Sequence, residues 1–120
     1  MPSIPDAAVI DPQALSNLRA LNEGDNDEFL REITVIYLED TPLRIKELDE
    51  SMAAGDASKF SRAAHSIKGS SANLGAILVR GAAEKLETQS RQSGVGGLVP
   101  LVESLKAEFA RADTELRKLL

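Results

Sequence analysis

The sequence AHSIKGSSANLGA, residues 64–76, contains His65, the only histidine of the 120-residue chain. Helical periodicity places the apolar and small residues of this region on one face when about 100° is added per residue. That face consists of Phe60, Ala63, Ala64, Ile67, Ser71 and Leu74. His65 lies about 140° from Phe60 on the same helical wheel. We therefore predict that the imidazole points outward, from the middle of a helix.

The residues predicted to share the imidazole's face are mostly small. Ser61 lies one turn before His65, and Gly69 and Ala72 lie one and two turns after it. Glycine within a helix lowers its stability by about 1 kcal/mol relative to alanine, so the presence of Gly69 indicates a packing or functional requirement. Small side chains beside an imidazole leave space that the surface of another protein can occupy. We interpret this pattern as an approach route for a partner.

Two cations share the flank of His65. Arg62 precedes it by three residues and Lys68 follows it by three, the spacing at which side chains on a helix are neighbours. The Lys68 ammonium can reach an anion attached to the imidazole, as a charge-assisted hydrogen bond to phosphate requires. A neutral imidazole is also a nucleophile. This combination favours a covalent carrier of a phosphoryl group, and the alternative is a core or surface histidine without a functional role.

Other types of site fit this stretch poorly. The order Lys-Gly-Ser-Ser is not that of a phosphate-binding loop, which has Gly-Lys-Ser after a strand. One histidine among solvated carboxylates is weak evidence for a metal site. Ser70 and Ser71 are more simply small residues that allow helices to pack closely. We expect no metal and no cofactor.

Helix signals organise the rest of the chain. Asp11 and Pro12 start a short helix that Gly24 ends, and a second helix begins around Asn26 and continues, kinked at Pro42. Two more helices are expected at 57–73 and 76–92, followed by a glycine-rich loop at 92–97. In the last helix, apolar residues repeat at spacings of four and three from Leu98 to Leu119.

The predicted fold is therefore all-α, an antiparallel four-helix bundle with an additional short N-terminal helix. Residues 1–10 are expected to form an irregular lead-in, and residues 11–120 a single domain, which is all that 120 residues allow. Hydrophobic residues make up 42% but aromatics only 3%, so the core is aliphatic.

Composition also excludes several classes of protein. Without cysteine there is neither a disulfide framework nor a thiolate metal site. The net charge of −5 argues against general binding to nucleic acid or to an anionic membrane. No apolar run approaches the roughly 20 residues of a membrane helix, and the N-terminus does not resemble a signal peptide. We expect a cytoplasmic protein.

The central stretch resembles a family signature. AAHSIKGSSANLGA is similar to the pattern A-H-x-[LI]-K-G-[SA]-[SA]-x-x-[LI]-G-A of the histidine phosphotransfer (HPt) domain. The stretches FLREITVIYLEDTPLRIKELDESMAAGD and LETQSR resemble the family's second helix and the end of its fourth, so the likeness covers residues 11–120. It implies a four-helix bundle whose histidine accepts a phosphoryl group from the aspartyl phosphate of one receiver domain and passes it to another.

The resemblance assigns roles to particular residues. His65 matches the phosphoacceptor, Lys68 the lysine next to the phosphate, and Gly69 the small residue that permits receiver approach. Glu87 and Arg91 lie where the family often places polar groups facing the histidine, and some members have Gln at the position of Glu87. A carboxylate there could accept Nδ1–H of the ring and leave Nε2 as the nucleophile. The alternative is a solvated ion pair one turn apart.

These observations predict a phosphorelay carrier without autonomous kinase activity, because the sequence contains no ATP-binding element. Its partners would be receiver domains of response regulators, one of a hybrid sensor kinase and one of a downstream regulator, which would supply magnesium. We expect a monomer. Two alternatives remain at this stage: a terminal module excised from a hybrid sensor kinase, and a helical adaptor that docks partners without phosphotransfer.

Overall fold

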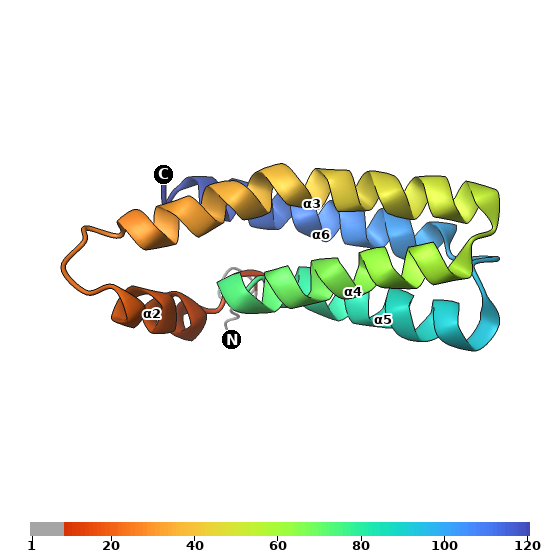
Figure 1. Ribbon diagram of the computed structural model, residues 1–120, viewed down its shortest axis with the longest axis horizontal. Coiled ribbons are helices and arrows are strands. Elements are labelled where there is room, and N and C mark those ends of the chain that lie inside the picture. Colours follow the sequence, from red (N-terminus) through yellow and green to blue (C-terminus); the bar gives the residue numbers. More distant parts are fainter. Residues whose placement is uncertain (1–8) are drawn as a thin grey trace, which may run out of the picture.

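The computed structural model describes residues 9–120 of the chain. Five helices with described bounds follow one another, and this part of the chain has no strand: α2 (Pro12–Leu21), α3 (Glu28–Ala54), α4 (Ala57–Leu74), α5 (Ile77–Ser93) and α6 (Val99–Arg117). Helices α3 to α6 run in alternating directions, and each packs on two neighbours to close a four-membered ring (Figure 1). The predicted antiparallel four-helix bundle with an additional short N-terminal helix is confirmed.

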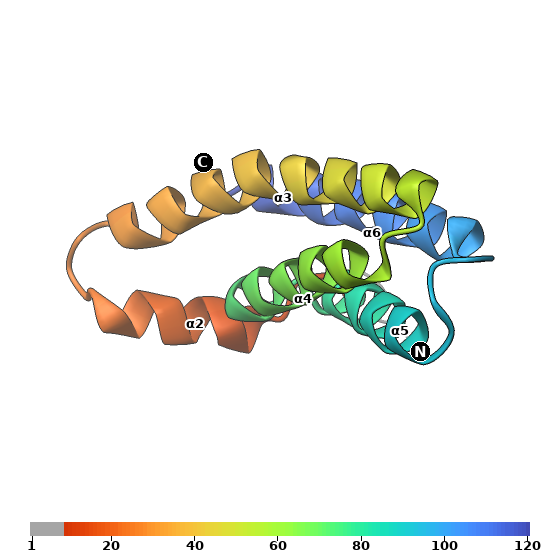
Figure 2. The same cartoon turned by 45° about the vertical axis from the view of Figure 1, so that its right-hand side comes forward.

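Helix α3 is long enough to pack on two different parts of the molecule. Its first turns extend past the end of α4, and α2 lies beside them, nearly in line with α4 (Figure 1). The helix continues without a break through Pro42, and its axis bends along its length (Figure 2). Proline inside a helix removes one backbone hydrogen bond and bends the axis. The expected single helix is therefore present, with a curved axis in place of a sharp kink.

Several helix ends lie where the sequence signals place them. The Asp11 carboxylate accepts from Gln13 N at 3.0 Å, and the Asp56 carboxylate accepts from Lys59 N at 3.0 Å, so both are side-chain N-caps. One boundary was predicted wrongly: α2 ends at Leu21 and not at Gly24. The lead-in expected at 1–10 falls almost entirely outside the described residues.

The core is aliphatic, as the composition requires, and all six residues predicted to form the inner face of α4 are buried. Tyr37 brings one of the polar groups into this core. Its hydroxyl hydrogen-bonds Ser71 Oγ at 2.7 Å, and its ring meets that of Phe109 edge-on at 5.8 Å. Burial raises the pKa of Tyr37 to about 12. Ser71 is thus a small packing residue, as expected, and also the partner of a buried hydroxyl.

Gly75 follows the last residue of α4 and packs against the first turn of α2. It adopts a left-handed conformation with φ of +74°, and its carbonyl accepts the backbone N–H of Asp11 at 2.8 Å. A Cβ at this position would lie 2.7 Å from Ala14 Cβ and 2.9 Å from the Asp11 carbonyl oxygen. Only glycine satisfies both the backbone angle and the close approach.

The two glycines of the central motif should respond oppositely to alanine. Gly69→Ala should stabilise the protein by up to about 1 kcal/mol, since its Cβ would meet no atom within 4 Å. Gly75→Ala should destabilise it by more than the roughly 1–2 kcal/mol of the left-handed conformation alone. Gly55→Ala, left-handed but in open space, separates the conformational cost from the steric one. Urea unfolding measures all three, and shifts of the same sign for Gly69 and Gly75 would contradict this account.

Candidate functional site

His65 projects from the middle of α4 with 63% of its side chain exposed. The inner face of α4 is fixed by its buried apolar residues, which leaves the imidazole on the opposite side of the helix. Its Nδ1 lies 2.9 Å from Oε2 of Glu87 on α5. One ring nitrogen is therefore held by the protein.

Glu87 is the centre of a small ionic cluster between α4 and α5. Its side chain is only 5% exposed, although it is a carboxylate. Lys68 Nζ lies 2.7 Å from Oε1, and Arg91 Nη2 lies 2.8 Å from Oε2. The ion pair between Glu87 and Arg91 is therefore present and Arg91 is exposed, but the pair is not a solvated one on the side of Glu87, whose carboxylate is buried and also contacts the imidazole.

The surroundings of Glu87 favour its ionised form. Burial alone would raise the pKa of this carboxyl. The hydrogen bonds from Lys68 and His65, together with the charges of Lys68 and Arg91, outweigh burial and lower the pKa below its ordinary value of 4.5. The carboxylate is thus an obligate hydrogen-bond acceptor at neutral pH.

An ionised acceptor determines the tautomer of the ring. Because both oxygens of Glu87 can only accept, a neutral His65 must carry its hydrogen on Nδ1 and donate it to Oε2. Nε2 then has a free lone pair. The site therefore combines a fixed imidazole with a nucleophilic nitrogen that the cluster leaves unused.

One predicted neighbour of the imidazole lies elsewhere. Ser61 was expected on the accessible face, but it is buried at 7% exposure, and its hydroxyl hydrogen-bonds Ser90 Oγ of α5 at 2.6 Å. It lies between the inner face of α4 and the imidazole, at the flank that α5 covers. Its position is wrong for contact with a phosphoryl group. Ser90, its partner, was not among the predicted site residues.

The remaining predicted residues divide into two groups. Gly69 and Ala72 are exposed, and a Cβ on Gly69 would meet no atom within 4 Å, so the space beside the imidazole is open. Arg62 is also exposed, but it borders a polar cleft between α3 and α4 with Arg44 and Glu47, and not the Glu87 cluster. Lys68 is close to His65, but in this structure its ammonium is bound to Glu87.

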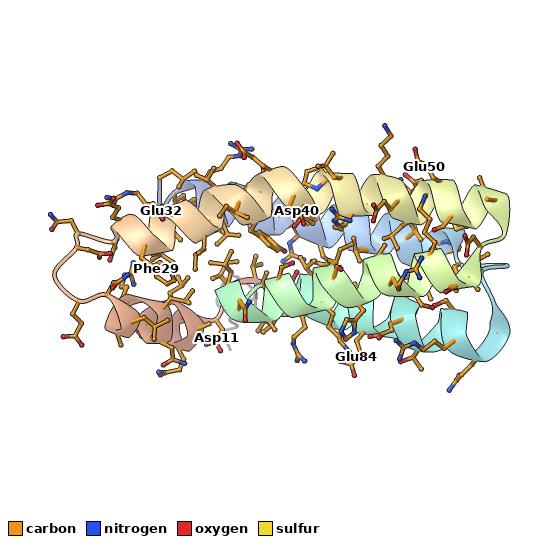
Figure 3. The ribbon with its side chains drawn as sticks, viewed as in Figure 1. Asp11, Phe29, Glu32, Asp40, Glu50 and Glu84 are labelled. Carbon is orange, nitrogen blue, oxygen red and sulfur yellow. The ribbon has the colours of Figure 1, made fainter. Side chains whose placement is uncertain are left out.

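An apolar groove lies at the junction of α2, α3 and α4, and no sequence signal indicated it. Figure 3 shows Phe29 on the side of α3 that faces α2, at one end of this region. The groove has a volume of about 430 Å³, and its rim includes Leu21 and Ile36, which are 67% and 62% exposed. Ser70 and Asn73 bring its lining onto α4, the helix of His65. Ile36 follows Phe29 and Ile33 at helical spacing in the sequence, which is typical of a buried face, yet it is exposed.

The bundle and its single imidazole define a class of protein that presents one nucleophilic histidine on a helical surface. Comparison with known proteins identifies the family: the Hpt domain profile matches residues 32–115, and the chain belongs to the Hpt domain family. The resemblance noted in the sequence is confirmed.

Individual relatives agree with this assignment. The chain is 30% identical over 98 residues to multistep phosphorelay regulator 1 of Schizosaccharomyces pombe, covering 82% of this chain and 33% of that protein. It is 26% identical over 95 residues to histidine-containing phosphotransfer protein 4 of Arabidopsis thaliana, covering 78% and 75%. The chain thus spans about a third of the first relative and three quarters of the second.

A solved structure matches almost the whole fold. Histidine-containing phosphotransfer protein B (HptB) of Pseudomonas aeruginosa superimposes with a TM-score of 0.81 at 30% identity, covering 93% of this chain and 94% of the other. An HPT domain from a sensor hybrid histidine kinase of Shewanella superimposes with a TM-score of 0.75 at 16% identity, which shows a common fold. In residues 9–120, no helix combines the length and apolar character needed to cross a bilayer.

The buried Glu87 carboxylate should make stability depend on acidic pH. Because its folded pKa is depressed, its contribution is present above the unfolded value of 4.5 and is lost as pH falls from there through the folded value. Glu87→Gln should cost about 1–2 kcal/mol at neutral pH, since a hydrogen bond to a charged group is replaced by a neutral one. Denaturant titrations between neutral pH and pH 3 should show the wild type losing more stability than the variant. Parallel losses would contradict the assignment.

Glu84→Gln is the matched control for this measurement. Glu84 lies one turn earlier on α5, is exposed, and pairs only loosely with Arg80 at 3.8 Å. Its replacement should leave the acid dependence of the wild type nearly unchanged.

Proposed function

We propose that this chain is a phosphorelay carrier that accepts a phosphoryl group on Nε2 of His65 and passes it on. The observation that carries the proposal is the 2.9 Å contact between Nδ1 and the buried Glu87 carboxylate, combined with the 63% exposure of the ring. That contact reserves one nitrogen for the protein and presents the other to a partner. Membership of the Hpt domain family supports the same chemistry.

The transfer step follows from this tautomer. The Nε2 lone pair attacks the phosphorus of an aspartyl phosphate, the P–O bond to the aspartate breaks, and the aspartate leaves as a carboxylate with the bonding pair. The ring keeps its hydrogen on Nδ1 and carries a positive charge while it is phosphorylated. Glu87 stabilises that charge through the Nδ1–H hydrogen bond. Attack by an aspartate of a second receiver reverses the step.

A receiver domain must bring the remaining catalytic groups. Phosphoryl transfer needs in-line alignment and several donors or a divalent cation to neutralise charge on the transferring oxygens. Lys68 and Arg91 are the cations at the cluster, and both are bound to Glu87. The chain therefore acts as a substrate of its partners and has no kinase activity of its own.

We propose that the apolar groove is part of a receiver-docking surface beside His65. Asn73 follows His65 by eight residues, which corresponds to about 12 Å along α4. A standard interface buries about 800 Å² on each partner, so one docked domain covers both the imidazole and the groove. Gly69 lies between them and leaves that surface flat. We infer that the receiver packs on α2, α3 and α4 while its aspartate faces His65.

We also propose that the protein is a cytoplasmic monomer, and that it connects the receiver of a hybrid sensor kinase with a downstream receiver. A module of a larger sensor kinase would use the same site in the same way. A docking-only adaptor would use the groove without the imidazole, and the following experiment separates it from a carrier.

His65→Gln should abolish acid-labile labelling by a phosphorylated receiver, and it should destabilise the chain by about 1 kcal/mol, because the mostly exposed ring gives up one of the three contacts that Glu87 accepts. The wild type should be labelled by a receiver phosphorylated with acetyl phosphate and magnesium, and it should not be labelled by ATP and magnesium alone. Intact mass at neutral pH measures both reactions. Labelling of the variant would refute the phosphoacceptor, and labelling by ATP alone would make the chain a kinase.

Ile36→Ser should weaken receiver binding about tenfold, the effect of removing a moderate apolar contact from an interface. Val99→Ser is the matched control, because Val99 is 54% exposed on α6, away from the groove. Isothermal titration with the receiver that labels the wild type fastest gives both affinities. Equal losses in the two variants would show that the groove is not the docking surface.

A further inference from the structure

Glu87 divides its two oxygens unequally among its partners. Lys68 alone holds Oε1 at 2.7 Å, whereas Arg91 and His65 share Oε2 at 2.8 and 2.9 Å. Lys68 comes from the helix of His65, and Arg91 comes from the helix of Glu87, one turn further on. The carboxylate therefore has one cation from each helix.

A phosphoryl group on Nε2 would compete for one of these cations. It adds negative charge on the outer side of the ring, and Glu87 occupies the inner side with Lys68 already bound to it. When an ammonium leaves a buried carboxylate, the unpaired negative charge destabilises the protein strongly unless another cation compensates it. In the phosphorylated state the charged ring contacts Oε2, so Lys68 can leave for the phosphoryl group only if a second counter-ion takes its place at Oε1.

Arg91 has the chemistry of that second counter-ion. A guanidinium is a planar fork that can bind both oxygens of a carboxylate, so it can take over Oε1 when the ammonium departs. An ammonium is a compact charge on a flexible stem, and this suits it to move. Lys68 also lies three residues from His65 on the same flank of α4, which favours it over Arg91 as the cation that reaches the phosphoryl group.

We propose that Arg91 is a positioning residue that releases Lys68 from Glu87 when His65 is phosphorylated. The inference rests on the proposed function of His65 and adds to it a change of partners within the ionic cluster. Arg91 acts through Lys68 and does not contact the phosphoryl group. In this account, the charge of Glu87 fixes the ring, and Arg91 prevents that charge from immobilising the lysine.

The test uses potassium phosphoramidate, which labels imidazoles without a partner protein. Nε2 attacks its phosphorus, the P–N bond breaks, and ammonia leaves from the already protonated nitrogen. The chain has a single histidine, so the rate of mass increase at neutral pH reports His65 alone. Arg91→Gln should slow labelling about fivefold. This ratio corresponds to the upper end of the interaction energies found for exposed ion pairs.

The decisive comparison is the same substitution in a Glu87→Gln background. There Lys68 has no carboxylate to leave, so Arg91→Gln should change the rate less than twofold. Arg91→Lys, which keeps a charge but not the fork, should give an intermediate rate in the Glu87 background. Lys68→Met should also slow labelling. Equal slowing by Arg91→Gln in both backgrounds would show that Arg91 contacts the phosphoryl group directly. No slowing in either background would show that Glu87 does not restrain Lys68. Each of these results would overturn the proposal.

A control on the same helix separates this effect from general loss of charge. Arg80 forms an exposed pair with Glu84, which Figure 3 shows on α5, and Arg80→Gln should leave the labelling rate unchanged. Circular dichroism confirms that each variant is folded. Failure of receivers to label the wild type would refute the proposed function, whereas the phosphoramidate rates test the role of Arg91 independently of any receiver.

Discussion

The buried carboxylate of Glu87 is the interaction on which the site depends. A charged group at 5% exposure is costly in a helical core, and it is maintained because three side chains donate to it. Two of those donors come from α4 and one from α5. The same contacts that compensate the charge therefore fix the orientation of His65 and the position of Lys68.

The packing of α4 on α5 makes this arrangement rigid. The two backbones approach closely, and both helices carry fully buried alanines, Ala64 on α4 and Ala83 on α5. The hydrogen bond between Ser61 and Ser90 lies one turn from the ionic cluster and satisfies two buried hydroxyls without water. A loose pair of helices would let Glu87 turn to solvent, and the imidazole would lose its tautomeric preference.

The fold was largely predictable because its signals are local. Asp11 and Asp56 cap helices through their own side chains, and the inner face of α4 follows from a 3.6-residue period. The exposure of His65 followed from the same period. The angular argument failed at Ser61, because a helical wheel does not show how far a neighbouring helix extends around the flank.

The missing parts of the site depend on contacts between helices. Glu87 is separated from His65 by 22 residues, and the spacing to Arg91 alone fits an exposed ion pair equally well. Its burial becomes visible only when α5 is placed against α4. The groove depends in the same way on α2, which supplies Leu18 and Leu21 to its lining, and Ile36 is exposed at its rim although it follows the helical spacing of its apolar neighbours.

The state of the ring is the most direct test of this account. A ¹⁵N spectrum of the single histidine in mildly alkaline solution should show a protonated Nδ1 and an unprotonated Nε2, and the Nε2-protonated tautomer would contradict it.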